Sequence, residues 1–179
     1  MRAGWILAAT FAAAAPAAAQ APAPISRVTD AGAIQLVVGD RITVRLLEGG
    51  RPEQVSVARA PAGGALPPKP GSRVGDLEAA PAGTVVLTLE RTADGEVFLK
   101  LLSGVSRAFD YRAVLIHETA AAGQFAGEPT SVCTVLPLLA SFEHWPGRPR
   151  TAGVLLTGFQ FRDTNEVVCP DPATLPPVK

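Results

Sequence analysis

The feature that most constrains the fold of this chain is a series of short runs in which apolar and polar residues alternate, separated by Gly, Pro and Asp. Alternation places the apolar side chains on one face of a β-strand, whereas few windows show the 3.6-residue period of a helix. The candidate strands are Ala33–Val38, Arg41–Leu47, Gln54–Arg59, Thr84–Arg91, Glu96–Leu102, Phe109–Glu118, Ser131–Leu136, Ala152–Arg162 and Glu166–Cys169. This pattern predicts an all-β chain, an antiparallel β-sandwich of the Ig-like or a related Greek-key type with about 7–9 short strands. A small antiparallel β-barrel is the alternative.

The clearest hairpin joins Thr84–Arg91 to Glu96–Leu102. Pairing Leu87 with Leu101 aligns the apolar residues of both strands and leaves three loop residues that end at Gly95. The third residue of such a loop adopts a left-handed backbone conformation, which glycine reaches without steric cost. Hydrophobic register and turn chemistry therefore predict the same pairing.

A second hairpin is expected where Gly39 separates two further alternating runs. Aligning Leu36 with Val44 matches the apolar faces of these runs and again leaves three loop residues. The glycine comes first in this loop, so the prediction depends on the hydrophobic register more than on the turn.

Residues 1–19 have the pattern of a secretory signal peptide. A positive charge at Arg2 precedes an apolar stretch, and small residues up to Ala19 stand before Gln20 in the pattern that signal peptidase accepts. We expect cleavage between Ala19 and Gln20 and a periplasmic or secreted protein. An uncleaved anchor is the alternative, but the apolar run is interrupted and shorter than the roughly 20 residues that span a bilayer. No integral membrane segment is expected after cleavage.

The charge of the mature chain excludes several classes of partner. Cleavage removes only Arg2 from the 16 Lys and Arg residues and leaves all 16 Asp and Glu residues, so the formal charge becomes −1. Nucleic-acid and anionic-lipid partners require a concentrated basic surface, and the sequence contains no basic run. We therefore expect no nucleic-acid partner.

The remaining chain is interpreted as one domain. An Ala/Pro tether at 20–24 precedes a β-sandwich domain at 25–169, and a Pro-rich tail occupies 170–179. Within the domain, 60–83 contains five prolines and five glycines and is predicted to be an exposed loop. The alternative makes 60–83 a linker between two domains, but the three short strands before it bury too little apolar surface to fold well alone.

Two cysteines, Cys133 and Cys169, lie in the last third of the chain. Because export places them in an oxidising compartment, we expect a structural disulfide between them. A redox pair is the alternative, but such pairs typically lie two residues apart at the start of a helix.

Common signatures of catalysis and cofactor binding are missing from the sequence. It contains no G-x-S-x-G elbow, no P-loop, no G-x-G-x-x-G, no H-E-x-x-H and no cysteine cluster spaced for zinc. We therefore predict no catalytic, cofactor-binding or metal-binding residue. A metal-dependent enzyme would have to use the only two histidines, His117 and His144. His117 ends the core-facing row of its strand, so we interpret it as a structural histidine, with a metal ligand or general base as the alternative.

The most distinctive segment is Ser141–Pro146, which combines two aromatic residues, an acid and an imidazole. An exposed tryptophan beside a carboxylate and a guanidinium offers stacking and polar selectivity to a small molecule or glycan. The candidate ligand contacts are Glu143, His144, Trp145 and Arg148. A tryptophan in a domain with so few aromatic residues is more often in the core, so burial of Trp145 is the favoured interpretation and the ligand site the alternative.

Three functional hypotheses follow from these patterns. The favoured one is an exported, non-catalytic module for protein interaction, envelope assembly or structure, whose partner is another envelope protein captured at an exposed strand edge. The alternatives are a small-ligand or glycan-binding module centred on Trp145 and, least favoured, a metal-dependent enzyme. Convergence of His117, His144, Glu143 and Trp145 on one cavity would favour the alternatives.

Overall fold

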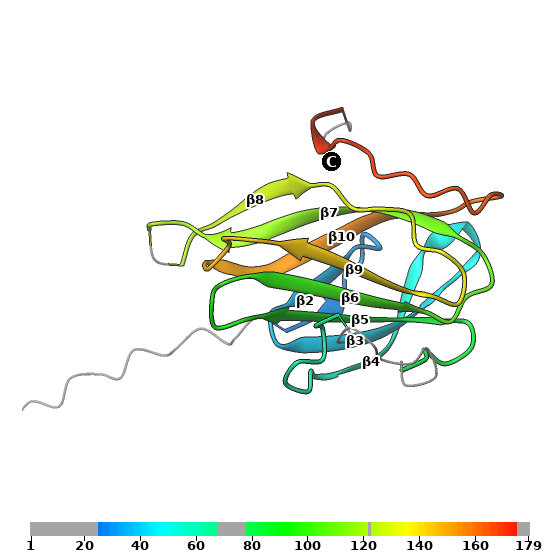
Figure 1. Cartoon of the computed structure of the whole chain (residues 1–179), viewed down its shortest axis with the longest axis horizontal. Coiled ribbons are helices and arrows are strands. Elements are labelled where there is room, and N and C mark those ends of the chain that lie inside the picture. The colour runs from blue at the N-terminus through cyan, green and yellow to red at the C-terminus, as the bar shows by residue number, and fades with distance from the viewer. Residues whose placement is uncertain (1–24, 68–77, 122, 175–179) are drawn as a thin grey trace, which may run out of the picture.

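The fold is a β-sandwich of two antiparallel sheets that pack face to face (Figure 1). It is seen in a computed structural model that describes residues 25–67, 78–121 and 123–174. The sheets do not close into a barrel, so the predicted sandwich is confirmed and the barrel alternative is excluded. The predicted signal peptide, the tether at 20–24, the middle of the 60–83 loop and the end of the tail lie outside the described residues.

Each sheet has five strands in the part of the chain that the structure describes. Sheet A has the order β1-β2-β10-β7-β8, formed by Arg27–Val28, Ile34–Val37, Thr151–Phe161, Phe109–Glu118 and Phe125–Thr130. Sheet B has the order β4-β3-β5-β6-β9, formed by Pro52–Arg59, Asp40–Leu46, Thr84–Arg91, Val97–Ser103 and Ala140–Trp145. Two short 3-10 turns, η1 (Glu48–Gly50) and η3 (Pro172–Thr174), complete the described elements. No helix among these residues is long and apolar enough to cross a bilayer.

The core lies between the inner faces of the two sheets. Alternation along each strand brings one apolar row to this interface, as the sequence pattern predicts. The largest fully buried side chains are Ile34, Leu36, Ile42, Leu87, Leu89, Leu99, Leu101, Phe109, Leu115 and Leu156. Both sheets contribute to one continuous cluster, so the two sheets belong to one folding unit.

The β5–β6 hairpin has the predicted register. Leu87 pairs with Leu101 and Leu89 with Leu99. Gly95 has a φ of 81°, the left-handed conformation that the turn requires.

The predicted hairpin around Gly39 is wrong. β2 belongs to sheet A and β3 to sheet B, so the two strands face each other across the core and share no ladder. Val38 donates its N–H to Ala152 in sheet A, and Gly39 donates to Leu89 in sheet B. With a φ of 87°, Gly39 turns the chain from one sheet to the other.

Two predicted strands near the cysteines are also wrong. Within 131–136 only Val135 forms a bridge, to Phe109, and 166–169 forms no strand. The segment 131–139 instead carries the chain from β8 in sheet A to β9 in sheet B. Val132 and Val135 are buried on the way, which explains why the segment is apolar without being a ladder strand.

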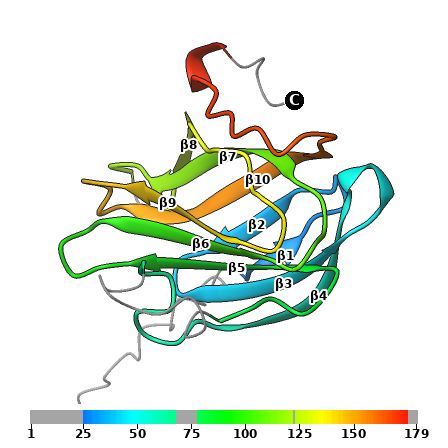
Figure 2. The ribbon, with the colours of Figure 1, turned by 45° about the vertical axis from the view of Figure 1, so that its right-hand side comes forward.

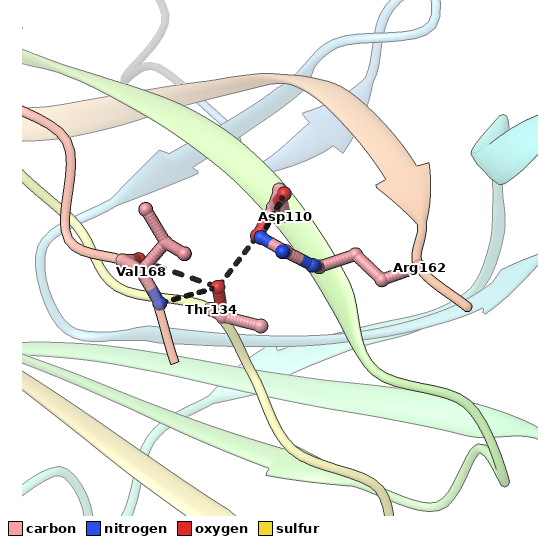
Figure 3. Close-up of polar contacts among 4 residues, drawn as sticks. All are labelled: Asp110, Thr134, Arg162 and Val168. Carbon is pink, nitrogen blue, oxygen red and sulfur yellow. Dashed lines mark hydrogen bonds and ion pairs between the residues drawn. The ribbon is translucent and has the colours of Figure 1, made fainter. Parts of the chain in front are cut away.

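The described C-terminal segment packs against the outer side of sheet A (Figure 2). The predicted disulfide, Cys133–Cys169, fixes it to the 131–139 crossing. Thr134 adds further contacts, shown in Figure 3. Its hydroxyl donates to Asp110 Oδ1 at 2.7 Å and accepts from the Val168 main-chain N–H at 3.1 Å. Arg162 pairs with the same Asp110 carboxylate at 3.0 Å.

Candidate functional site

The four candidate contacts of the sequence analysis divide between two faces of β9 and the turn that follows it. Glu143 pairs with Leu99 and Trp145 with Val97, both core residues, so these two side chains face inward. His144 pairs with Phe98 and faces outward. The alternation of the strand therefore separates the imidazole from the carboxylate next to it.

Trp145 is a core residue. Its side chain is 7% exposed and belongs to the cluster between the sheets. A ring in this position presents no open face on which a sugar or another ligand could stack.

Glu143 satisfies two donors within the protein. Its Oε1 accepts the Tyr111 hydroxyl at 3.3 Å and the Cys133 main-chain N–H at 3.0 Å. Burial raises the pKa of this carboxyl, although the hydrogen bond from Cys133 acts in the opposite direction. Burial and the nearby Glu143 charge also raise the pKa of Tyr111 well above its ordinary value. These contacts join β9 of sheet B to β7 of sheet A, which is a structural role.

The remaining candidates lie apart from this pair. His144 stacks on Phe98 with ring centroids 4.3 Å apart, and its Nε2 lies 3.3 Å from Glu96. His117 is on β7 of sheet A, opposite Thr151. The two histidines therefore occupy different sheets and do not form a shared site. Among the described residues, no three His, Cys, Asp or Glu side chains group as metal ligands would.

Arg148 lies in the turn after β9. Its guanidinium pairs with Glu128 of β8 at 2.6 Å, and both side chains are partly exposed. The pair links the two strands that end their sheets on this side of the sandwich.

A cleft lies on the outer face of sheet B. We call it the Leu102 cleft, after the outward residue at the end of β6. It has a volume of about 320 Å³ and lies between the segment that enters β5, the end of β6 and the segment that enters β9. Its lining is mainly apolar and includes Ala79, Ala82, Leu102, Leu139 and Ala140.

Two exposed leucines form one wall of this cleft. Leu138 is 67% exposed and Leu139 is 55% exposed. Leu138 has a φ of 58°, and it is the only non-glycine residue with a positive φ in the described chain. The left-handed conformation costs a leucine roughly 1–2 kcal/mol because its Cβ approaches the carbonyl oxygen.

Main-chain hydrogen bonds hold this wall in place. Leu138 donates its N–H to the Val105 carbonyl at 3.2 Å, and the Leu139 carbonyl accepts from Ser103 at 2.9 Å. These hydrogen bonds to Ser103, the last residue of β6, and to Val105 hold the main chain in a position that leaves both leucine side chains exposed to water. Exposed apolar surface of this kind typically marks a place where a partner binds.

Glu78 brings a charge to the lining of the cleft. Glu78 lines the cleft, and its carboxylate pairs with Arg41 of β3 and, at 3.5 Å, with Lys100 of β6. The hydrogen bond from Arg41 is the largest cause that lowers the pKa of Glu78. The lining of the cleft therefore combines apolar side chains with one ion-paired carboxylate.

The sequence analysis did not identify this cleft. Leu138 and Leu139 follow a predicted strand and resemble ordinary core residues, and Glu78 lies in a Pro/Gly-rich loop. The available signal was the pair of leucines after Pro137, at a point where no alternating partner accounts for both. Their exposure depends on the 131–139 crossing, which local periodicity does not predict.

The described residues thus define an antiparallel β-sandwich with an apolar cleft on the outer face of one sheet. The chain matches no family model, no curated protein and no solved structure at significance.

Proposed function

We propose that this protein is an exported, non-catalytic interaction module that binds an apolar segment of another envelope protein in the Leu102 cleft. The observation that carries the proposal is Leu138, an exposed leucine held in a left-handed conformation at the wall of an apolar cleft. Strain and exposure both cost free energy, and neither adds to the core. Features of this kind are found where a protein contacts its ligand.

The size of the cleft limits what it binds. A volume of about 320 Å³ is at the lower end of the range for ligand pockets, so it holds one or two side chains of leucine size. Such a cleft suits a short linear segment better than a folded domain. A short segment of another protein is a ligand that the hypothesis of an interaction module allows. The burial of Trp145 in the core makes the Trp145 region the weaker candidate for ligand binding.

Chemical-shift mapping tests this proposal with a defined probe. We would titrate the ¹⁵N-labelled mature protein with acetyl-Leu-Leu-amide, which carries two apolar side chains and no charge. Binding at the cleft predicts saturable shifts at Leu102, Leu139 and Ala140, with a Kd of about 1 mM for so small a ligand.

Val55 on β4 serves as the matched control, because it is 50% exposed on the edge strand of the same sheet and lies outside the cleft. Shifts at Val55 equal to those at the cleft would show adsorption to any exposed apolar residue and would overturn the proposal. The absence of saturable shifts at the cleft would overturn it as well.

A further inference from the structure

Two cations of sheet B hold the Glu78 carboxylate. Thr88 of β5 pairs across the sheet with Arg41 on one side and with Lys100 on the other. Directly opposite residues in antiparallel strands point to the same side, so these three side chains form a row on the outer face. Glu78 binds both cations and therefore bridges this row.

The middle residue of this row, Thr88, carries an unsatisfied hydroxyl. Thr88 is 1% exposed, and its Oγ1 forms no hydrogen bond in the part of the chain that the structure describes. A buried hydroxyl without a partner costs roughly 1–3 kcal/mol. In the free protein the Glu78 carboxylate bonds to the two cations and not to this hydroxyl.

The charges of this row favour an anionic ligand. Arg41 and Lys100 contribute two positive charges and Glu78 one negative charge, so the group keeps a net charge of +1. Their side chains are only 25% and 14% exposed, which strengthens their interaction with a carboxylate relative to fully solvated groups. Glu78 itself has 44% of its side chain exposed, so it is the partner that can leave.

We infer that the Leu102 cleft recognises the C-terminal carboxylate of a polypeptide that ends in apolar residues, and that Glu78 occupies the carboxylate site in the free protein. In the complex, the incoming carboxylate replaces Glu78 at Arg41 and Lys100. The apolar residues that precede it lie along Leu102 toward the exposed leucines. This inference rests on the proposed function, because it uses the same cleft and names its ligand.

The experiment compares two probes that differ only at the terminus: acetyl-Leu-Leu with a free carboxylate, and acetyl-Leu-Leu-amide. Both are titrated against the mature protein and its Glu78→Gln variant by chemical-shift mapping. Removing the internal competitor should tighten binding of the acid about fivefold, the effect of one partly exposed ion pair. Binding of the amide, which has no carboxylate to compete with Glu78, should gain much less than binding of the acid.

Glu53→Gln is the matched control for this variant. Glu53 pairs with Arg45 on the same sheet, at 3.0 Å, and the pair does not line the cleft. Its replacement should leave the affinity for the acid unchanged. A tightening by Glu53→Gln equal to that of Glu78→Gln would reflect a general change of surface charge and would overturn the inference.

Arg41→Gln tests whether the Arg41 guanidinium binds the carboxylate of the ligand. This variant should lose the preference for the acid over the amide, whereas Arg45→Gln on the same strand should retain it. Equal binding of both probes to the wild type, with no effect of Glu78→Gln, would overturn the inference while leaving the proposed function in place. Binding of neither probe would overturn both.

Discussion

At the scale of single residues, a substitution at Leu138 should weaken ligand binding without destabilising the fold. Asparagine tolerates the left-handed conformation better than leucine does, and a side chain that is 67% exposed contributes little to the core. We predict that Leu138→Asn raises the free energy of unfolding by up to about 1 kcal/mol, measured by urea denaturation. The same variant should weaken binding of acetyl-Leu-Leu-amide.

A loss of more than about 1 kcal/mol on this substitution would contradict the account, because it would mean that the Leu138 side chain supports the fold. Unchanged probe binding in a stable variant would show that the cleft does not use this residue.

Glu143 gives a second prediction at this scale, which concerns pH. Its folded pKa is raised above the ordinary value of 4.5, chiefly by burial. The folded state therefore holds the proton longer than the unfolded state, and its stability falls as the pH rises from about the ordinary value through the raised one. Above the raised pKa, the full cost of the buried charge is present.

Glu143→Gln removes this titration and keeps an oxygen that accepts from Tyr111 and Cys133. We predict that the unfolding free energy of the wild type declines relative to the variant across that pH window. Urea denaturation at several pH values measures the difference between the two proteins. A constant difference at every pH would show that Glu143 is not shifted by burial.

Because side chains alternate along a strand, the face that each one occupies follows from its position in the sequence once the strand is known. Along β9, Glu143 and His144 lie on opposite faces, since one pairs with Leu99 and the other with Phe98. The sequence does not reveal that the Glu143 carboxylate accepts a hydrogen bond from the Tyr111 hydroxyl, because that contact joins two strands of different sheets. Local patterns specify which face a side chain occupies, and long-range topology decides what it contacts there.

At the scale of elements, the disulfide supports the C-terminal segment. Cys133 and Cys169 are 36 residues apart in sequence, so the bond removes substantial conformational entropy from the unfolded chain. We predict that replacing both cysteines with serine lowers the unfolding free energy by about 3–4 kcal/mol. Urea denaturation of the variant and of the oxidised wild type measures this loss.

Reduction of the wild type is the matching control and should reproduce the effect of the double substitution. A loss below about 1 kcal/mol in both would indicate that Thr134 and Asp110 hold the segment without the covalent bond.

Strand boundaries were predictable where one strand pairs with the next in sequence. The β5–β6 hairpin is the clear case, because register and Gly95 agree. At Gly39 the same kind of pattern marks a crossing between sheets. A hairpin and a crossing both place two apolar faces toward the core, so alternation alone does not distinguish them.

β8 and β9 were not predicted as strands for a different reason. β8 includes Gly127 and Pro129, residues that are depleted in strands and are tolerated at an edge. β9 contains Glu143 on its inner face, which interrupts the apolar row. Edge strands are the elements whose sequences depend least on the core, and they are the least visible from sequence.

At the scale of the whole molecule, the account requires export. The mature protein should begin at Gln20, because the small residues before it form the cleavage pattern. Amino-terminal sequencing of protein purified from the envelope fraction measures this directly. Recovery of a chain that starts at Met1, or of protein only in the cytoplasmic fraction, would contradict the proposed location and the oxidising setting of the disulfide.

The central claim is that the Leu102 cleft binds another envelope protein, and site-specific photocrosslinking in intact cells tests it most directly. A photoreactive p-benzoylphenylalanine is placed at Leu139 in the cleft wall and, separately, at Val55 on β4, which is similarly exposed. The account predicts a discrete adduct from position 139, identified by mass spectrometry at a chain segment with apolar residues, and no such adduct from position 55. The same adducts from both positions, or none from position 139, would contradict it.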